Sequence, residues 1–128
     1  MNNYIEASEI IAHLKYSRFV SSIKIIVIDE IFSRSVLRLR CNLLPSSYHL
    51  DIRFIQTEKE VIYSYQLFTD HALVRWDNAP HYPEIKTFPH HYHNLKGKVE
   101  ASPLKGAIFD DLNYVLENIK NILLSNEA

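Results

Sequence analysis

The chain has 128 residues, of which 47% are hydrophobic, and this length and composition fit one globular domain with a single core. Its formal net charge of −1 argues against a strongly basic nucleic-acid-binding protein, whose phosphate contacts need clustered Lys and Arg. No run of residues approaches the ~20 apolar positions that a membrane-spanning helix needs. A lone cysteine, Cys41, excludes an internal disulfide. We therefore expect a cytoplasmic protein without a membrane anchor.

The first predicted element is a short amphipathic helix that ends near Tyr16, because apolar residues recur at helical spacing from Ile5 to Leu14. Strand-like segments follow, each either dense in β-branched residues or alternating between apolar and polar side chains. Short connections between these segments predict an antiparallel meander, since parallel pairing needs a crossover of about a dozen residues. The five predicted strands lie at about residues 23–29, 35–43, 48–55, 61–68 and 72–76.

The strand pattern stops after Trp76, and a connection without predicted structure runs from Asp77 to about Gly106. A helix over residues 108–124 closes the chain, because its apolar residues form a single stripe. The sequence therefore predicts an α+β fold, in which an N-terminal and a C-terminal helix pack on one face of a five-stranded antiparallel sheet. We expect the whole chain to be one domain, with a helical extension at residues 1–17 and a core at residues 18–128.

The long connection contains the most unusual composition in the chain. Residues 77–93 read DNAPHYPEIKTFPHHYH and hold four of the seven histidines and three of the five prolines. Proline restricts the backbone, and aromatic side chains can anchor a segment to the sheet, so we expect a stiff, ordered loop. Loops of this length in compact domains are commonly functional, which makes this segment the candidate site.

Three interpretations of these histidines follow from residue chemistry. With Asp77 and Glu84 they could ligate a divalent metal, although HHxH in a loop lacks the fixed helical spacing of a zinc-protease site. Without a metal, two histidines could act as general base and general acid in phosphodiester transfer, while an arginine stabilises the developing charge. The third interpretation is structural, with histidines that bond to the backbone and end strands. Residue chemistry alone leaves all three in place.

The two strands before the loop add further candidates. Tyr63 and Tyr65 are two residues apart and project from one face of their strand. Arg75 alternates with apolar residues that we expect to face the helices, so we place Arg75 on the open face of the sheet with the tyrosine pair beside it. Asp77 and Asn78 follow at the end of that strand. Converging Tyr, Arg, Asp and His side chains are what a nucleic-acid cleft needs.

These segments resemble a known family. YSY at residues 63–65 and LVRWDNAPHYPEIKTFPHHYH at residues 73–93 are similar to the motifs of TumE-type proteins, small prokaryotic toxins of toxin–antitoxin pairs. Val99-Glu100 and a final helix with the pattern L-x-x-V-L-x-x-I continue the resemblance, which covers about residues 20–124 and leaves the N-terminal helix outside.

The chain departs from the family pattern at four positions within these motifs. Gln66 and Leu67 stand where the family tends to have His and Trp. Tyr82 replaces a usual His, and Tyr92 replaces a usual Lys. The histidine lost at Tyr82 removes a candidate ligand, and the lysine lost at Tyr92 removes a candidate phosphate contact.

The resemblance implies a toxin with a cognate antitoxin, often a helix-turn-helix protein. Our leading hypothesis is a small ribonuclease in which His90 and His91 transfer protons without a metal, with a divalent metal as the alternative cofactor. The alternative function is a non-catalytic binding module that sequesters a partner protein through the His- and Pro-rich loop. The predicted catalytic residues are His81, His90, His91, Arg75 and Asp77, and the predicted substrate contacts, with RNA as substrate, are Tyr63, Tyr65, Asn78 and His93.

Overall fold

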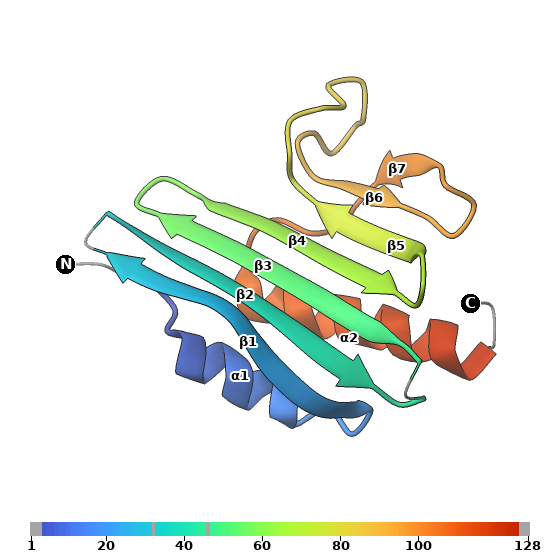
Figure 1. Cartoon of the computed structure of the whole chain (residues 1–128). Coiled ribbons are helices and arrows are strands. Elements are labelled where there is room, and N and C mark those ends of the chain that lie inside the picture. The colour runs from blue at the N-terminus through green and yellow to red at the C-terminus, as the bar shows by residue number, and fades with distance from the viewer. Residues whose placement is uncertain (1–3, 32, 46, 126–128) are drawn as a thin grey trace.

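The computed structural model describes residues 4–31, 33–45 and 47–125. Within them, helix α1 (Ala7–Lys15) precedes an antiparallel sheet, and helix α2 (Ile108–Ser125) follows it (Figure 1). The sheet has seven strands, which pair in the order of the sequence. The α+β class and the meander are therefore confirmed. The strands are β1 (Val20–Ile31), β2 (Arg34–Leu43), β3 (His49–Thr57), β4 (Val61–Phe68), β5 (Ala72–Asp77), β6 (His91–His93) and β7 (Val99–Ala101).

The prediction of five strands is wrong, because the connection after β5 contains the hairpin β6–β7. β6 pairs with β5 and extends the sheet beyond it, and β7 pairs with β6 (Figure 1). Each of these two strands has three residues, which is too short for an alternating pattern to be visible in the sequence. The irregular part of the connection therefore reduces mainly to the loop between Asp77 and His91.

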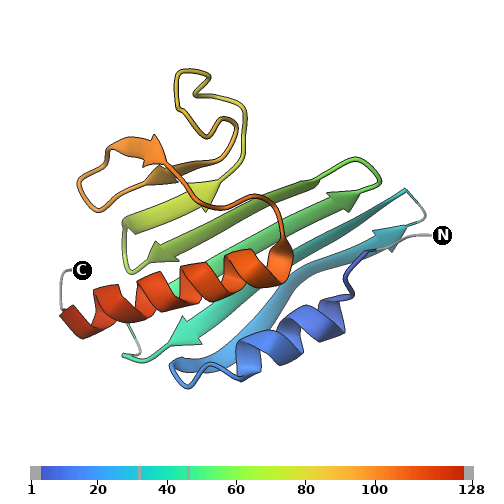
Figure 2. The ribbon, with the colours of Figure 1, turned by 180° about the vertical axis from the view of Figure 1, so that it is seen from behind.

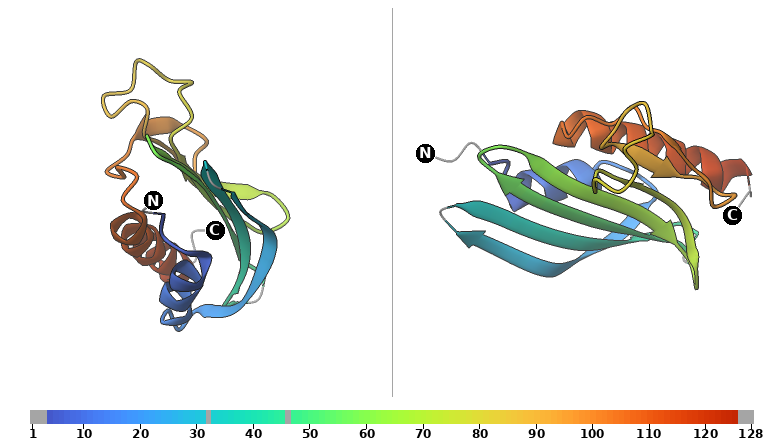
Figure 3. Two further views of the ribbon diagram at one scale, coloured as in Figure 1. Left: turned by 90° about the vertical axis from the view of Figure 1, so that its left-hand side faces the viewer. Right: turned by 90° about the horizontal axis from the view of Figure 1, so that it is seen from above.

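Both helices lie on the same face of the sheet, as predicted (Figures 2 and 3). α1 begins with a capping box in which Glu6 and Glu9 satisfy each other's backbone N–H groups. The side chain of Asp111, in the first turn of α2, accepts hydrogen bonds from the backbone N–H groups of Lys105 and Gly106. Among the described residues, neither helix is long and apolar enough to cross a bilayer.

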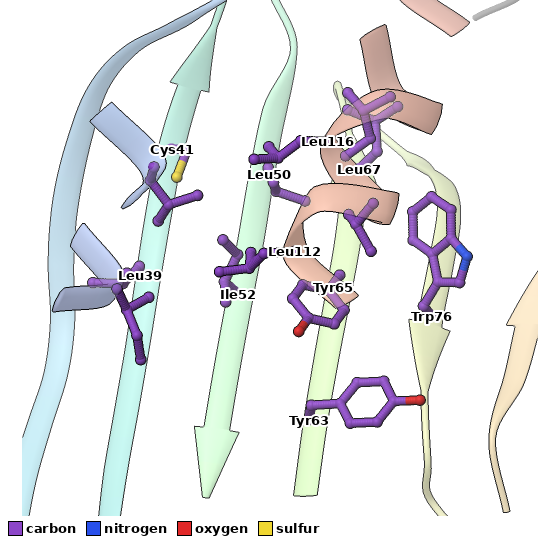
Figure 4. Close-up of a cluster of buried hydrophobic side chains, with 14 of the residues drawn as sticks. Leu39, Cys41, Leu50, Ile52, Tyr63, Tyr65, Leu67, Trp76, Leu112 and Leu116 are labelled. Carbon is purple, nitrogen blue, oxygen red and sulfur yellow. The ribbon is translucent and has the colours of Figure 1, made fainter. Parts of the chain in front are cut away.

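The core lies between the helices and one face of β2–β5 (Figure 4). Alternate residues of these strands are buried against α2, as the sequence pattern predicted for β2 and β3. Burying a large apolar side chain, such as that of Leu or Ile, stabilises the fold by roughly 1.5–3 kcal/mol. The strand residues between them point to the opposite face, which no helix of the described chain covers, and we call this the open face. Fully buried strand and helix residues include Leu39, Ile52, Tyr65, Trp76, Leu112 and Ile119.

β1 is an edge strand of the sheet and is irregular in its middle. Ile25 pairs with Leu39 whereas Val27 pairs with Arg38, so Ile26 is an additional residue in a β-bulge. A second change in register follows Val20. The strand keeps its pairing with β2 on both sides of the bulge.

Candidate functional site

Four side chains from two strands meet at the end of β5. Arg75 pairs with His93, and Asp77 pairs with His91, across the β5–β6 ladder. Residues that pair across a ladder share a face, so all four lie on the side of the open face. His81, from the segment after β5, joins them in lining a cleft of about 490 Å³.

Asp77 is the centre of this cluster, and its side chain is only 6% exposed. Its Oδ2 atom accepts a hydrogen bond of 2.8 Å from Arg75 Nε, and its Oδ1 atom accepts one of 3.0 Å from the backbone N–H of Ala79. The same Oδ1 atom lies 3.0 Å from His91 Nε2. Buried carboxylates need such partners, and this one has Arg75, Ala79 and His91 around it.

His91 is fixed at both of its ring nitrogens. Nδ1 lies 2.9 Å from the carbonyl oxygen of Pro89, which only accepts, so Nδ1 donates. Nε2 faces the Asp77 carboxylate, and it donates there when the ring carries both protons. Because His91 is 1% exposed and both nitrogens are engaged, its ring is placed to orient Asp77 and does not have a nitrogen free for a substrate.

His93 is the histidine of this cluster that is open to the cleft. Its side chain is 30% exposed, and Nε2 lies 3.7 Å from Asp77 Oδ2. Partial burial lowers the pKa of His93 below its ordinary value, the charges of His91 and Arg75 lower it further, and the Asp77 carboxylate opposes them. This shift favours the uncharged ring of His93, in which one nitrogen can accept a proton. The ring of Tyr82 packs edge-on against His91 at 4.8 Å and His93 at 5.8 Å, between ring centres.

His90 lies on the other side of the sheet from this cluster. Its Nδ1 atom is 2.8 Å from the Tyr63 hydroxyl, and the two rings stack with their centres 5.8 Å apart. Burial lowers the pKa of His90, while the charge of Asp111 opposes this effect. Consecutive residues of an extended chain point in opposite directions, so the structure does not bring His90 and His91 into one site.

The expected position of Tyr63 and Tyr65 on the open face is wrong. Both tyrosines are buried among the core side chains that face α2 (Figure 4), with 2% and 0% of their surface exposed. The cause is the register of β4 against β5, which places Tyr65 opposite Trp76 and Gln66 opposite Arg75. Burial and the nearby carboxylate of Asp111 raise the pKa of both hydroxyls.

Asn78 has a structural partner for each end of its amide. Its Oδ1 atom accepts a hydrogen bond from the backbone N–H of Tyr63, and its Nδ2 atom donates one to the carbonyl of Val61. These bonds, of 3.0 and 2.8 Å, continue the pairing of β4 beyond the end of β5. Asn78 therefore holds the start of the loop against the sheet.

Asp77, His91 and His93 are the described residues whose geometry suits a metal ion. One ligand atom from each lies within 4.8 Å of the others. The Asp77 carboxylate, however, already accepts hydrogen bonds from Arg75 and Ala79. A guanidinium at 2.8 Å opposes a second cation on the same carboxylate, so the Asp77 carboxylate suits its contacts with Arg75 and His91 better than it suits a divalent metal.

Gln66 and Tyr82 also line the cleft, although neither was among the predicted site residues. Gln66 lies beside Arg75, and Tyr82 packs against the histidines of β6. Both stand at positions where the chain departs from the motif of the family that it resembles. That departure was the available signal in the sequence, because the strand register that brings Gln66 to the cleft is not visible there.

The comparisons with known proteins agree with this resemblance. The family model described as Toxin TumE matches residues 6–123 of the 128-residue chain. The match includes α1, which the resemblance in the sequence left outside, and it implies an antitoxin partner. No curated protein and no solved structure matches the chain. The chain belongs to the TumE toxin family.

Proposed function

We propose that the protein is the toxin of a toxin–antitoxin pair and that it acts as a metal-independent ribonuclease at the cleft beside Asp77. The observation that carries this proposal is the position of a partly exposed histidine, His93, directly opposite Arg75 on the neighbouring strand. RNA carries its own nucleophile, the 2′-hydroxyl, next to each phosphate. A site that cleaves it needs a base, an acid and a positive charge, and the cleft offers all three.

In this reaction His93 removes the proton of the 2′-hydroxyl, and the 2′-oxygen attacks the adjacent phosphorus. Arg75, which is 45% exposed, faces the negative charge that develops on the phosphoryl oxygens. His81 lines the cleft and is exposed, so it is placed to donate a proton to the departing 5′-oxygen. The P–O5′ bond breaks, and the products end in a 2′,3′-cyclic phosphate and a 5′-hydroxyl.

The remaining residues of the cluster position these groups. Asp77 holds the Arg75 side chain, and His91 contacts Asp77 through Nε2 while its Nδ1 atom is bonded to the Pro89 carbonyl. The rate of such a reaction depends strongly on the alignment of the reacting groups, since small displacements can lower it about a hundredfold. This assignment revises the predicted pair of His90 and His91, because His90 lies away from the cleft.

The test is cleavage of single-stranded RNA by the purified protein, with and without EDTA. We expect cleavage that survives EDTA, products with 2′,3′-cyclic phosphate ends, and no cleavage when the 2′-hydroxyl is absent. His93→Ala should lower the rate about 10²–10⁴-fold, as expected for loss of a general base. His13→Ala is the matched control, because His13 lies in α1 on the helix side of the sheet.

Each other outcome points to a different function. Cleavage that EDTA abolishes would replace proton transfer by His93 with a metal held by Asp77, His91 and His93. An unchanged rate in His93→Ala would remove the assigned base. Absence of cleavage in every condition would favour the non-catalytic binding module, and antitoxin binding by loop variants would then be the measurement that matters.

A further inference from the structure

The charges of the protein are separated between the two faces of its sheet. Although the chain has a formal net charge of −1, its cationic strand residues gather on the open face. In the described strands β1–β5, six Lys or Arg side chains and three Asp side chains point to that face. The cationic residues are Lys24, Arg34, Arg38, Arg40, Arg53 and Arg75.

The strand register arranges part of this charge in a row that starts at the cleft. From Arg75 the row passes through Gln66 and Asp51 to Arg40 and Lys24, one residue from each strand from β5 to β1. Adjacent strands lie about 4.8 Å apart, so the row extends about 19 Å across the sheet. A parallel row runs beside it and contributes Arg53 and Arg38.

A second hollow lies along this row. It has a volume of about 280 Å³ and is lined by Arg38, Arg40 and Phe68. Gln66 and Ala72 line both this hollow and the cleft beside Asp77, so the two are neighbours that share a wall. The Arg40 guanidinium stands 5.2 Å from the centre of the Phe68 ring.

We propose that this hollow binds the neighbouring nucleotide of the RNA strand whose cleaved phosphate lies at Arg75. Arg38 and Arg40 contact its phosphate, and Phe68 stacks on its base. Single-stranded RNA is bound in this way, by cations along the backbone and aromatic rings against the bases. The inference rests on the proposed ribonuclease function, and it names a substrate subsite that this function leaves open.

Asp51 competes with the phosphate in this arrangement. Its Oδ2 atom accepts hydrogen bonds from Arg38 Nε and Nη2 at 3.2 and 3.1 Å, and its Oδ1 atom lies 3.5 Å from Arg40 Nε. The carboxylate therefore occupies the guanidinium edges that would face an RNA phosphate. Removing its charge while keeping its shape, in Asp51→Asn, frees both arginines and should tighten RNA binding.

The experiment measures binding of a fluorescently labelled single-stranded RNA that carries 2′-O-methyl groups and cannot be cleaved. Fluorescence anisotropy is recorded at several salt concentrations for the full chain and its variants. Asp51→Asn should bind about tenfold more tightly. The triple variant Arg38→Gln, Arg40→Gln, Asp51→Asn, which leaves no unpaired carboxylate, should bind about a hundredfold more weakly than Asp51→Asn.

The salt dependence and two further variants distinguish binding at the subsite from nonspecific electrostatic attraction of RNA to the protein. Each arginine that contacts a phosphate and is replaced by glutamine should reduce the slope of log affinity against log salt by roughly 0.7. Phe68→Leu should weaken binding about tenfold with that slope unchanged, because it removes the ring that stacks on the base and leaves both arginine charges in place. Arg18→Gln is the matched control, since it makes the same change outside the sheet, and its affinity should stay at that of the unmodified chain.

These results also keep the subsite and the ribonuclease distinguishable. If the protein cleaves RNA but the triple variant binds and cleaves it like the unmodified chain, the subsite is refuted and the ribonuclease stands. If no RNA is cut yet the variants shift affinity as stated, the subsite stands and the catalytic assignment fails. Equal affinity of Asp51→Asn and the triple variant, or an effect of Arg18→Gln as large as theirs, also overturns the subsite.

Discussion

Replacing Asp77 by asparagine tests whether one carboxylate holds the candidate site together. Asparagine keeps a single acceptor oxygen and places an NH₂ group where the other oxygen stood. With its oxygen toward Ala79 and His91, its NH₂ group meets the Arg75 guanidinium, donor against donor. The flipped amide instead turns the NH₂ group toward the Ala79 N–H. Either orientation leaves a donor in this nearly buried position without its acceptor.

The magnitude follows from the bonds that are lost. A hydrogen bond to a charged group contributes about 1.5–3 kcal/mol, and loss of the Arg75 bond counts for less than this because Arg75 is 45% exposed. The weakened His91 pair is fully buried and adds to the loss. We therefore expect Asp77→Asn to lower the free energy of unfolding by about 2 kcal/mol, or Tm by about 8 °C. RNA cleavage should fall at least about a hundredfold, because Arg75 and His93 lose their alignment.

Urea unfolding followed by circular dichroism measures the stability change, with the RNA cleavage assay run on the same preparations. Asp29→Asn is the control, because Asp29 is exposed on β1 at the far side of the sheet, and it should change stability by less than about 0.5 kcal/mol. Wild-type stability in Asp77→Asn would refute the view that this carboxylate organises the cluster. Normal cleavage by a destabilised Asp77→Asn would leave the structural role and remove the catalytic one.

Three further predictions concern single residues. The pKa of His90 is lowered on folding, so its stabilising contribution is complete above about pH 6.5 and is lost as the pH falls below that value. Between about pH 8 and pH 5, the free energy of unfolding should therefore fall less in His90→Gln than in the unmodified chain. An equal fall in the two proteins would contradict this prediction. Asn78→Ala removes both hydrogen bonds to β4 and should lower the free energy of unfolding by about 1–3 kcal/mol. In urea this loss appears as a lower midpoint with an unchanged m value. An unchanged midpoint would show that the amide is dispensable. Burial, and to a smaller extent the charge of Asp51, raises the pKa of the Cys41 thiol to about 12. Iodoacetamide should therefore modify this thiol only after the protein unfolds. Labelling of the native protein as fast as that of the unfolded protein would contradict its burial.

The fold was predictable where the sequence has strong periodicity. Strands β1–β5 and both helices contain enough residues for an apolar face to repeat, and the short connections between β1 and β5 leave little choice of topology. The β6–β7 hairpin was not predictable, because the three residues of β6 belong to a histidine-rich motif in which no apolar alternation exists. Only pairing with β5 makes this segment a strand.

The candidate site was predictable in its composition and not in its arrangement. Arg75, Asp77, His91 and His93 were all among the predicted residues, and the structure gathers them in one cluster. Alternation shows that Tyr63 and Tyr65 share a face, but it does not relate the face of one strand to that of its neighbour. That relation depends on the register of β4 against β5, and tyrosine is amphipathic enough to suit either side.

The bulge at Ile26 limits how another chain could extend this sheet. Backbone N–H and C=O groups of a strand point alternately to its two sides, and one inserted residue reverses which positions point outward. The outer edge of β1 is therefore divided into short hydrogen-bonding segments, and the outward groups of residues 22–25 are out of phase with those of residues 27–31. A regular strand can match one of them and not both. The exposed isoleucines of this edge, such as Ile25 and Ile28, are thus protected from continuous strand-to-strand aggregation by a single additional residue.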